Sequence, residues 1–75
     1  MRELVDYVAR SLVSLPDAVT VTEVDDNGTL VLQLQVAPED IGKVIGRQGR
    51  IANALRALIK VAAVREGRRA ILEIL

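Results

Sequence analysis

The chain has 75 residues with ten basic and ten acidic side chains, so its formal net charge is zero, and half of its residues are apolar. This length fits one small domain, which we place at residues 1–75. Tyr7 is the only aromatic residue, and cysteine and histidine are absent. This composition argues against a disulfide framework, a thiolate metal site and a nucleophile–histidine pair, so we expect neither a cofactor nor an enzyme.

The start of the chain has no apolar signal region, and no apolar run approaches the roughly eighteen residues that a membrane span needs. We therefore expect a cytoplasmic protein without membrane contact. The charges are unevenly distributed, because residues 1–40 sum to −6 and residues 41–75 sum to +6. A basic half of this kind is typical of a phosphate-bearing partner, although charges also simply solvate a surface.

The first half of the chain predicts a helix followed by a hairpin. Residues 2–15 form the helix, which ends before Pro16, with an apolar stripe of Leu4, Val8, Leu12 and Leu15. Residues 18–24 are rich in β-branched side chains, and residues 30–36 alternate between apolar and polar. Asn27 and Gly28 between them suit a type I′ turn, so these two strands are expected to be antiparallel.

The second half predicts two helices and a last strand. A short helix begins at Pro38 and stops near Gly46, and a longer one covers residues 50–66, with Gly67 as its C-terminal stop. The inward stripe of the longer helix is expected to contain Ile51, Ala54, Leu55, Leu58 and Ala62. Residues 68–75 then form a strand parallel to the second one. The predicted fold is α+β, in the order α-β-β-α-α-β, with a three-stranded mixed sheet and three helices packed on one face.

The segment "VIGRQGRI", residues 44–51, places two glycines three apart in the turn between the two later helices. Glycine permits positive φ and lets a ligand approach the main chain, and the start of the following helix favours an anion. A bare G-x-x-G is a weak signal, because chance gives one in about a third of chains this long. A glycine turn that closes a helical hairpin without any ligand is the structural alternative.

With its surroundings, "IGKVIGRQGRIANALRALI" resembles the KH motif, whose G-x-x-G loop clamps about four unpaired nucleotides. The element order matches the type II form of that fold, and the whole chain is similar to the small stand-alone bacterial KH proteins of the KhpA type. The resemblance implies a cytoplasmic binder of single-stranded RNA that acts as an RNA chaperone or post-transcriptional regulator. It also implies a homodimer, a heteromer with a larger Jag-type (KhpB) RNA-binding protein, and a link to cell shape and cell-wall growth.

The resemblance also implies a set of RNA-binding residues: Lys43, Ile45, Gly46, Arg47, Gln48, Gly49, Arg50, Ile51 and Asn53. Core packing explains the two isoleucines at least as well as base contact does. Plain solvation is the simpler interpretation of Arg56 and Lys60, while Arg68 and Arg69 fit a charged turn as well as an RNA contact.

The longer helix also has an outward aliphatic set, Ala57, Val61 and Val64, which is a candidate dimer contact. An alternative function is therefore a protein-interaction module that uses the KH fold mainly to dock a partner.

Overall fold

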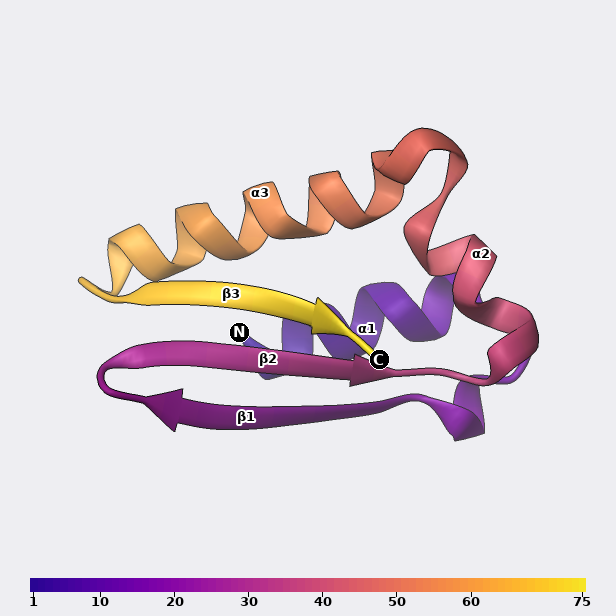
Figure 1. The fold of residues 1–75 in the computed structure, drawn as a ribbon, viewed down its shortest axis with the longest axis horizontal. Coiled ribbons are helices and arrows are strands. Elements are labelled where there is room, and N and C mark those ends of the chain that lie inside the picture. Colours follow the sequence, from indigo (N-terminus) through magenta and orange to yellow (C-terminus); the bar gives the residue numbers. More distant parts are fainter.

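One three-stranded sheet organises the fold in the computed structural model, which describes residues 1–75 (Figure 1). β1 (Thr20–Asp26) pairs antiparallel with β2 (Thr29–Gln35), and β3 (Arg69–Ile74) pairs parallel with the other side of β2. The strand order is β1-β2-β3, so β2 is central. The element order and the mixed sheet confirm the predicted α+β arrangement.

The turn between β1 and β2 has the geometry that its sequence predicts. Asn27 has φ of 53° and Gly28 has φ of 87°, and a type I′ turn requires positive φ at both positions. β1 starts two residues later than predicted, because Pro16–Ala18 forms a 3₁₀ turn before the strand.

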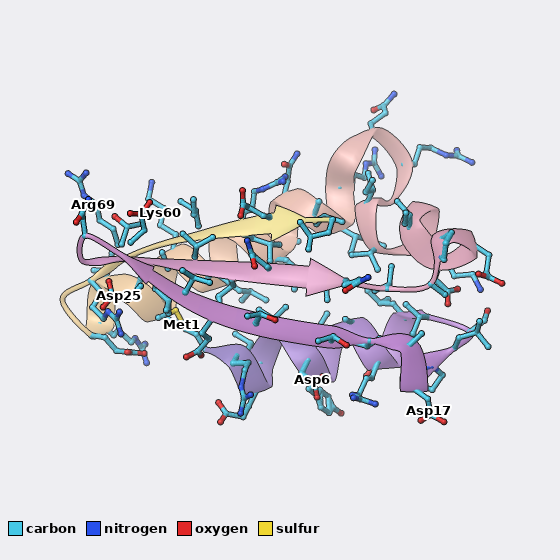
Figure 2. The ribbon with its side chains drawn as sticks, turned by 60° about the horizontal axis from the view of Figure 1, so that its bottom comes forward. Met1, Asp6, Asp17, Asp25, Lys60 and Arg69 are labelled. Carbon is cyan, nitrogen blue, oxygen red and sulfur yellow. The ribbon has the colours of Figure 1, made fainter.

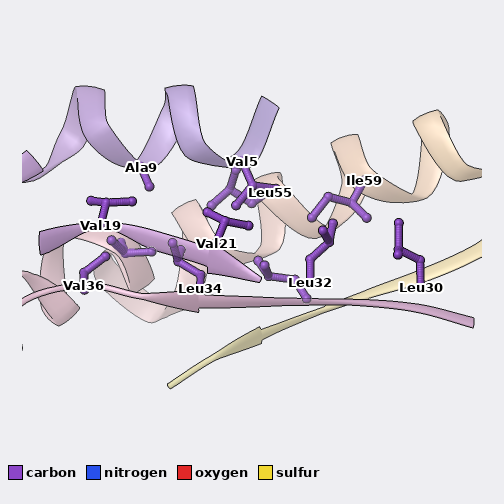
Figure 3. Close-up of a cluster of buried hydrophobic side chains, with 12 residues drawn as sticks. Val5, Ala9, Val19, Val21, Leu30, Leu32, Leu34, Val36, Leu55 and Ile59 are labelled. Carbon is purple, nitrogen blue, oxygen red and sulfur yellow. The ribbon is translucent and has the colours of Figure 1, made fainter. Parts of the chain in front are cut away.

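Two of the three helices cover one face of the sheet. These are α1 (Arg2–Leu12) and α3 (Arg50–Arg65), which lie on the same side of the strands in Figure 3. The short α2 (Ile41–Ile45) joins the end of β2 to the start of α3, after a 3₁₀ turn at Pro38–Asp40. None of the helices has both the length and the apolar composition needed to cross a membrane.

The core lies between the sheet and these helices. The alternating residues of the central strand region are all buried, as predicted: Leu30, Leu32, Leu34 and Val36. Figure 3 shows Val5 and Ala9 of α1 and Leu55 and Ile59 of α3 pointing toward them. The core is therefore built from aliphatic side chains contributed by both halves of the chain.

The predicted end of the first helix is wrong, and so is most of its stripe, of which Val8 packs against the core. α1 ends at Leu12, because Val13 is extended with φ of −91° and ψ of 160°. Its fully buried residues are Val5 and Ala9, whereas Leu4 is 37% exposed and Leu15, beyond the helix, is 46% exposed. Beyond the helix, the amides of Ser14 and Leu15 bind a side chain from the start of α2, described below.

The predicted inward stripe of α3 is also wrong in its rotation about the helix axis. The buried residues are Ala52, Leu55, Ile59 and Ala63. Of the predicted stripe only Leu55 is buried, Ile51 and Ala62 are half-buried, and Ala54 and Leu58 are exposed. Two alanines in the observed stripe let the helix approach the sheet closely, which larger side chains would prevent.

Candidate nucleic-acid interface

The turn at residues 46–49 reverses the chain between α2 and α3 through three residues with positive φ. Gly46 has φ of 73° and ψ of 175°, Gln48 has φ of 57° and ψ of 27°, and Gly49 has φ of 74° and ψ of 15°. The Gly46 conformation belongs to a region that only glycine occupies readily. Gln48 is in the left-handed region, which a non-glycine residue occupies at some cost.

Gly46 also needs to be glycine because of a close neighbour. A Cβ atom at this position would lie 2.8 Å from Cγ1 and 3.0 Å from the backbone nitrogen of Ile51. The backbone atom belongs to the first turn of α3, so it cannot move aside without moving the helix. The first glycine therefore sets how closely α2 approaches the start of α3.

The side chains around this turn are largely open to solvent. Arg47, Gln48, Arg50 and Asn53 are exposed, and Ile45 is 37% exposed. Ile51 is half-buried and packs against the core, which supports the core interpretation for that residue. No side chain caps the N-terminus of α3. The N–H groups of Gly49 and Arg50 bond to the carbonyl oxygens of Gly46 and Arg47, and the positive end of the helix dipole favours an anion here.

Lys43 differs from the other candidate cations because it is already paired inside the protein. Its ammonium lies 3.5 Å from Oδ1 of Asp40 and donates a hydrogen bond to the Ser14 hydroxyl. Arg47 and Arg50 form no ion pair within the chain. The turn itself therefore offers two free positive charges rather than three.

Asp40, the partner of Lys43, is almost completely buried and carries a negative charge at neutral pH. The N–H group of Ser14 is the largest cause that lowers the pKa of Asp40 below its ordinary value of 3.8. Burial opposes this effect, while the N–H group of Leu15 and the charge of Lys43 add to it.

A groove of about 490 Å³ runs between α3 and β3. Its floor is aliphatic and includes Ile59 and Leu72. Its rim carries four basic residues: Arg56, Lys60, Arg68 and Arg69. The groove and the turn are joined along one side of α3, since Asn53 lies beside Gly49 and accepts a hydrogen bond of 3.5 Å from Arg56.

The sequence interpretation did not bring these four basic residues together. It favoured plain solvation for Arg56 and Lys60, and it left Arg68 and Arg69 open between a charged turn and an RNA contact. The chain reverses after Gly67, which has φ of 68°, so the start of β3 returns along the end of α3. The sequence did contain one signal for this arrangement, namely the predicted end of the longer helix at Gly67. The reversal there brings Arg68 and Arg69 to the same groove as Arg56 and Lys60.

Charges of opposite sign from the two halves of the sequence are partly separated on the molecule. Lys60 and Arg69 lie near the α3–β3 side in Figure 2, whereas Asp6 and Asp17 lie on the α1–β1 side. Asp25 is an exception, because it sits near the basic side and its Oδ2 lies 3.7 Å from Arg68. A polyanion would therefore meet a favourable potential mainly at the groove and the turn.

The outer face of α3 carries the aliphatic set predicted from the helix pattern. Ala57 is exposed, Val61 is 57% exposed and Val64 is 69% exposed. Ala54 and Leu58 are exposed as well, and Leu58 joins this set because of the rotation of the helix described above. Five aliphatic side chains thus form one solvent-facing surface, which we call the outer face.

Comparison with known proteins gives a consistent result across the chain. The family model described as "KhpA/KhpB, KH domain" matches residues 2–74. The RNA-binding protein KhpA of Clostridium acetobutylicum is 53% identical over 75 residues, which cover 100% of both chains. KhpA of Caldanaerobacter subterraneus subsp. tengcongensis has the same identity and coverage. KhpA of Treponema pallidum is 52% identical over 73 residues, covering 97% of this chain and 91% of the relative. No solved structure gives a significant match.

The two glycines at the ends of "GKVIG" provide a matched test of the turn geometry. We expect Gly46→Ala to destabilise the fold by about 1–3 kcal/mol, because the new Cβ meets the backbone of Ile51 in a glycine-only conformation. Gly42→Ala should instead stabilise by roughly 0.5–1 kcal/mol, because Gly42 is helical and a Cβ there meets nothing within 4 Å. Urea unfolding of both variants measures the difference, and equal effects would contradict the close approach.

Proposed function

Because this chain belongs to the KhpA/KhpB family of KH domains, we propose that it binds single-stranded RNA through the turn at residues 46–49 and the adjoining groove. KH domains hold unpaired nucleotides by clamping the backbone on the G-x-x-G loop. The observation that carries the proposal is the turn itself, which combines two glycines with positive φ, the uncapped N-terminus of α3 and two arginines without an ion-pair partner. The family is one of RNA-binding domains, not of enzymes.

The phosphates of the RNA would lie over the start of α3. There the positive end of the α3 dipole and the guanidinium groups of Arg47 and Arg50 supply positive potential. Gly46 and Gly49 leave the main chain uncovered by side chains, so a sugar-phosphate backbone can approach it. Gln48 and Asn53 are neutral, so they contribute hydrogen bonds rather than charge.

The bases would continue into the groove between α3 and β3. Its aliphatic floor offers Ile59 and Leu72 as contact surfaces for unstacked bases, and Ile45 offers another beside the turn. The rim residues Arg56 and Lys60 follow Asn53 along the same side of α3, so they extend the positive track away from the turn. Contacts of this kind favour binding of unpaired strands by shape and charge with little base selectivity.

The outer face of α3 supports a second proposal, namely that two copies associate through it. A surface of Ala54, Ala57, Leu58, Val61 and Val64 buries apolar area when it meets a copy of itself across a two-fold axis. The side chains are small, so we expect a modest affinity. The same face would serve a protein partner in the alternative interaction-module function.

Several finer points stay predictions that come from family membership. They are pairing with a larger KhpB protein, action as an RNA chaperone or post-transcriptional regulator, a role in cell shape and cell-wall growth, and a cytoplasmic location. The naming of the family after both KhpA and KhpB is consistent with such a pair.

Charge reversal in the turn tests the RNA site directly. We expect Arg47→Asp combined with Gln48→Asp to weaken binding of a randomised single-stranded RNA at least about tenfold at 0.1 M salt, since phosphates meet repulsive charge. The turn should survive, because aspartate tolerates the left-handed conformation of residue 48 better than glutamine does. Fluorescence anisotropy measures the binding, and circular dichroism checks the fold.

The matched control makes the same substitutions outside the turn and the groove, Arg2→Asp in α1 combined with Gln35→Asp in β2, where both residues are exposed. It changes the net charge equally and should bind RNA almost as the wild type does. Equal losses in both double variants would mean that net charge, and not the turn, governs binding. If the wild type itself binds no RNA but retains a protein partner, the interaction-module function is favoured.

The groove is tested by the salt dependence of binding. With about two to four phosphates neutralised, the slope of log K against log salt should be about −1.5 to −3. Arg56→Ala should flatten this slope by about 0.7, the value for one phosphate on a single strand. Arg65→Ala removes a second exposed arginine of α3 that does not line the groove, so it should leave the slope unchanged. Identical slopes for the two variants would exclude the groove from the RNA path.

Self-association is tested at Val61, which lies in the outer face but does not line the groove. We expect Val61→Glu to convert a concentration-dependent dimer into a monomer in sedimentation equilibrium, because the carboxylate would be desolvated in the contact. Val24→Glu places the same change on an exposed valine of β1 and should leave the dimer intact. A dimer that survives Val61→Glu would place the contact elsewhere.

A further inference from the structure

Asp40 is the only charged residue among the 17 buried residues, with 1% of its surface exposed. Burying an ionised carboxylate is unfavourable unless hydrogen bonds and a counter-charge compensate it. Asp40 has both. Its two oxygens accept the backbone N–H groups of Ser14 and Leu15 at 3.0 Å each, and Lys43 supplies the positive charge.

These bonds connect two segments that lie far apart in the sequence. Ser14 and Leu15 belong to the connector that follows α1, while Asp40 immediately precedes α2. The two amides would otherwise lack a partner at the end of a helix, so one side chain satisfies the connector and fixes its path. Asp40 therefore ties the connector after α1 to the first turn of α2.

α2 depends on such external contacts because it has only five residues. A helix of this length is unstable by itself in water and takes its position from tertiary contacts. Within α2, Val44 is buried and Ile41 packs against the core while half-buried, and Asp40 adds a polar anchor at the start of the helix. The chain then enters the turn directly at Gly46. A change in the position of α2 would therefore move the G-x-x-G turn.

The carboxylate of Asp40 also forms an ion pair with the ammonium of Lys43. The ammonium lies between Oδ1 of Asp40 and the Ser14 hydroxyl, although the lysine side chain is 50% exposed. A phosphate at the turn would have to compete with this arrangement for the ammonium. At Arg47 and Arg50 a phosphate would not compete with a carboxylate, because neither arginine has an ion-pair partner.

We propose that Asp40 is a positioning residue for the G-x-x-G turn: it anchors α2 to the connector after α1 and holds Lys43 as a structural cation, which leaves phosphate contact to Arg47 and Arg50. This inference rests on the proposed RNA-binding function. It revises the sequence-based expectation that Lys43 contacts RNA.

Hydrogen exchange of the free protein tests the anchoring without RNA. In Asp40→Asn, an amide nitrogen replaces one acceptor and the negative charge is lost, so the anchor is broken. We expect the hydrogen-bonded amides of Gly46, Gly49 and Arg50 to exchange at least about tenfold faster, while those of β2 and of the middle of α3 stay unchanged. Asp17→Asn is the matched control, because Asp17 is an exposed carboxylate in the nearby 3₁₀ turn. Unchanged exchange at the turn in Asp40→Asn would overturn the proposal.

If Asp40→Asn does not fold, Asp40→Glu replaces it. Glutamate keeps the charge but moves the carboxylate by one methylene, so faster exchange confined to the turn is again expected. Exchange equal to that of the wild type at residues 46–50 would again contradict the anchoring role.

The role of Lys43 is tested by the salt dependence of RNA binding. Lys43→Met should leave the slope of log K against log salt unchanged, whereas Arg47→Met should flatten it by about 0.7. A flattening of about 0.7 in Lys43→Met would show that Lys43 contacts a phosphate and would overturn this part of the proposal. If the wild type binds no RNA, the proposed function fails, and the exchange experiment still decides whether Asp40 holds the turn.

Discussion

The close approach of Gly46 to Ile51 is the constraint on which the site and the sheet both depend. It lets α3 start immediately after α2 and run back along the sheet, and this return brings β3 beside β2 in the parallel direction. A parallel pair of neighbouring strands requires a crossover, and here two helices and one tight turn provide it. The residue that permits the crossover also leaves the main chain open at the turn. The fold and the proposed RNA contact therefore have the same physical origin.

The features of the fold that were predictable from the sequence are those with a local cause. The hairpin followed from the positive φ that Asn27 and Gly28 accept and from strict alternation in β2. The rotation of α3 was not predictable in this way, because eleven of its sixteen residues are aliphatic and several stripes have helical spacing. The choice of Ile59 over Leu58 for the core depends on the shape of the sheet beneath the helix. That information is not contained in the period of one segment.

The geometry of the candidate site was predictable at the turn, but the contacts of the residues around the turn were not. The glycine spacing located the reversal, but the sequence could not show that Lys43 is paired, since its partner Ser14 lies 29 residues away. In the same way, Arg56 and Lys60 look like solvated helix residues until β3 returns beside them and closes a groove. The charge along the sequence predicts that the second half of the chain faces a polyanion. Which charges are free depends on contacts between segments that are distant in the sequence.

α3 presents three different surfaces, and nearly every one of its residues is either aliphatic or basic. One side packs on the sheet through Leu55 and Ile59, the next borders the groove with Arg56 and Lys60, and the outer face presents Val61 and its neighbours. The outer face and the groove rim are adjacent, because Val64 belongs to the first and also lines the second. A second copy bound to the outer face would therefore lie close to the RNA path. Self-association and RNA binding would then influence each other, because both use α3. Self-association would raise the affinity for RNA if the second copy adds positive charge near the groove, and lower it if that copy obstructs the groove.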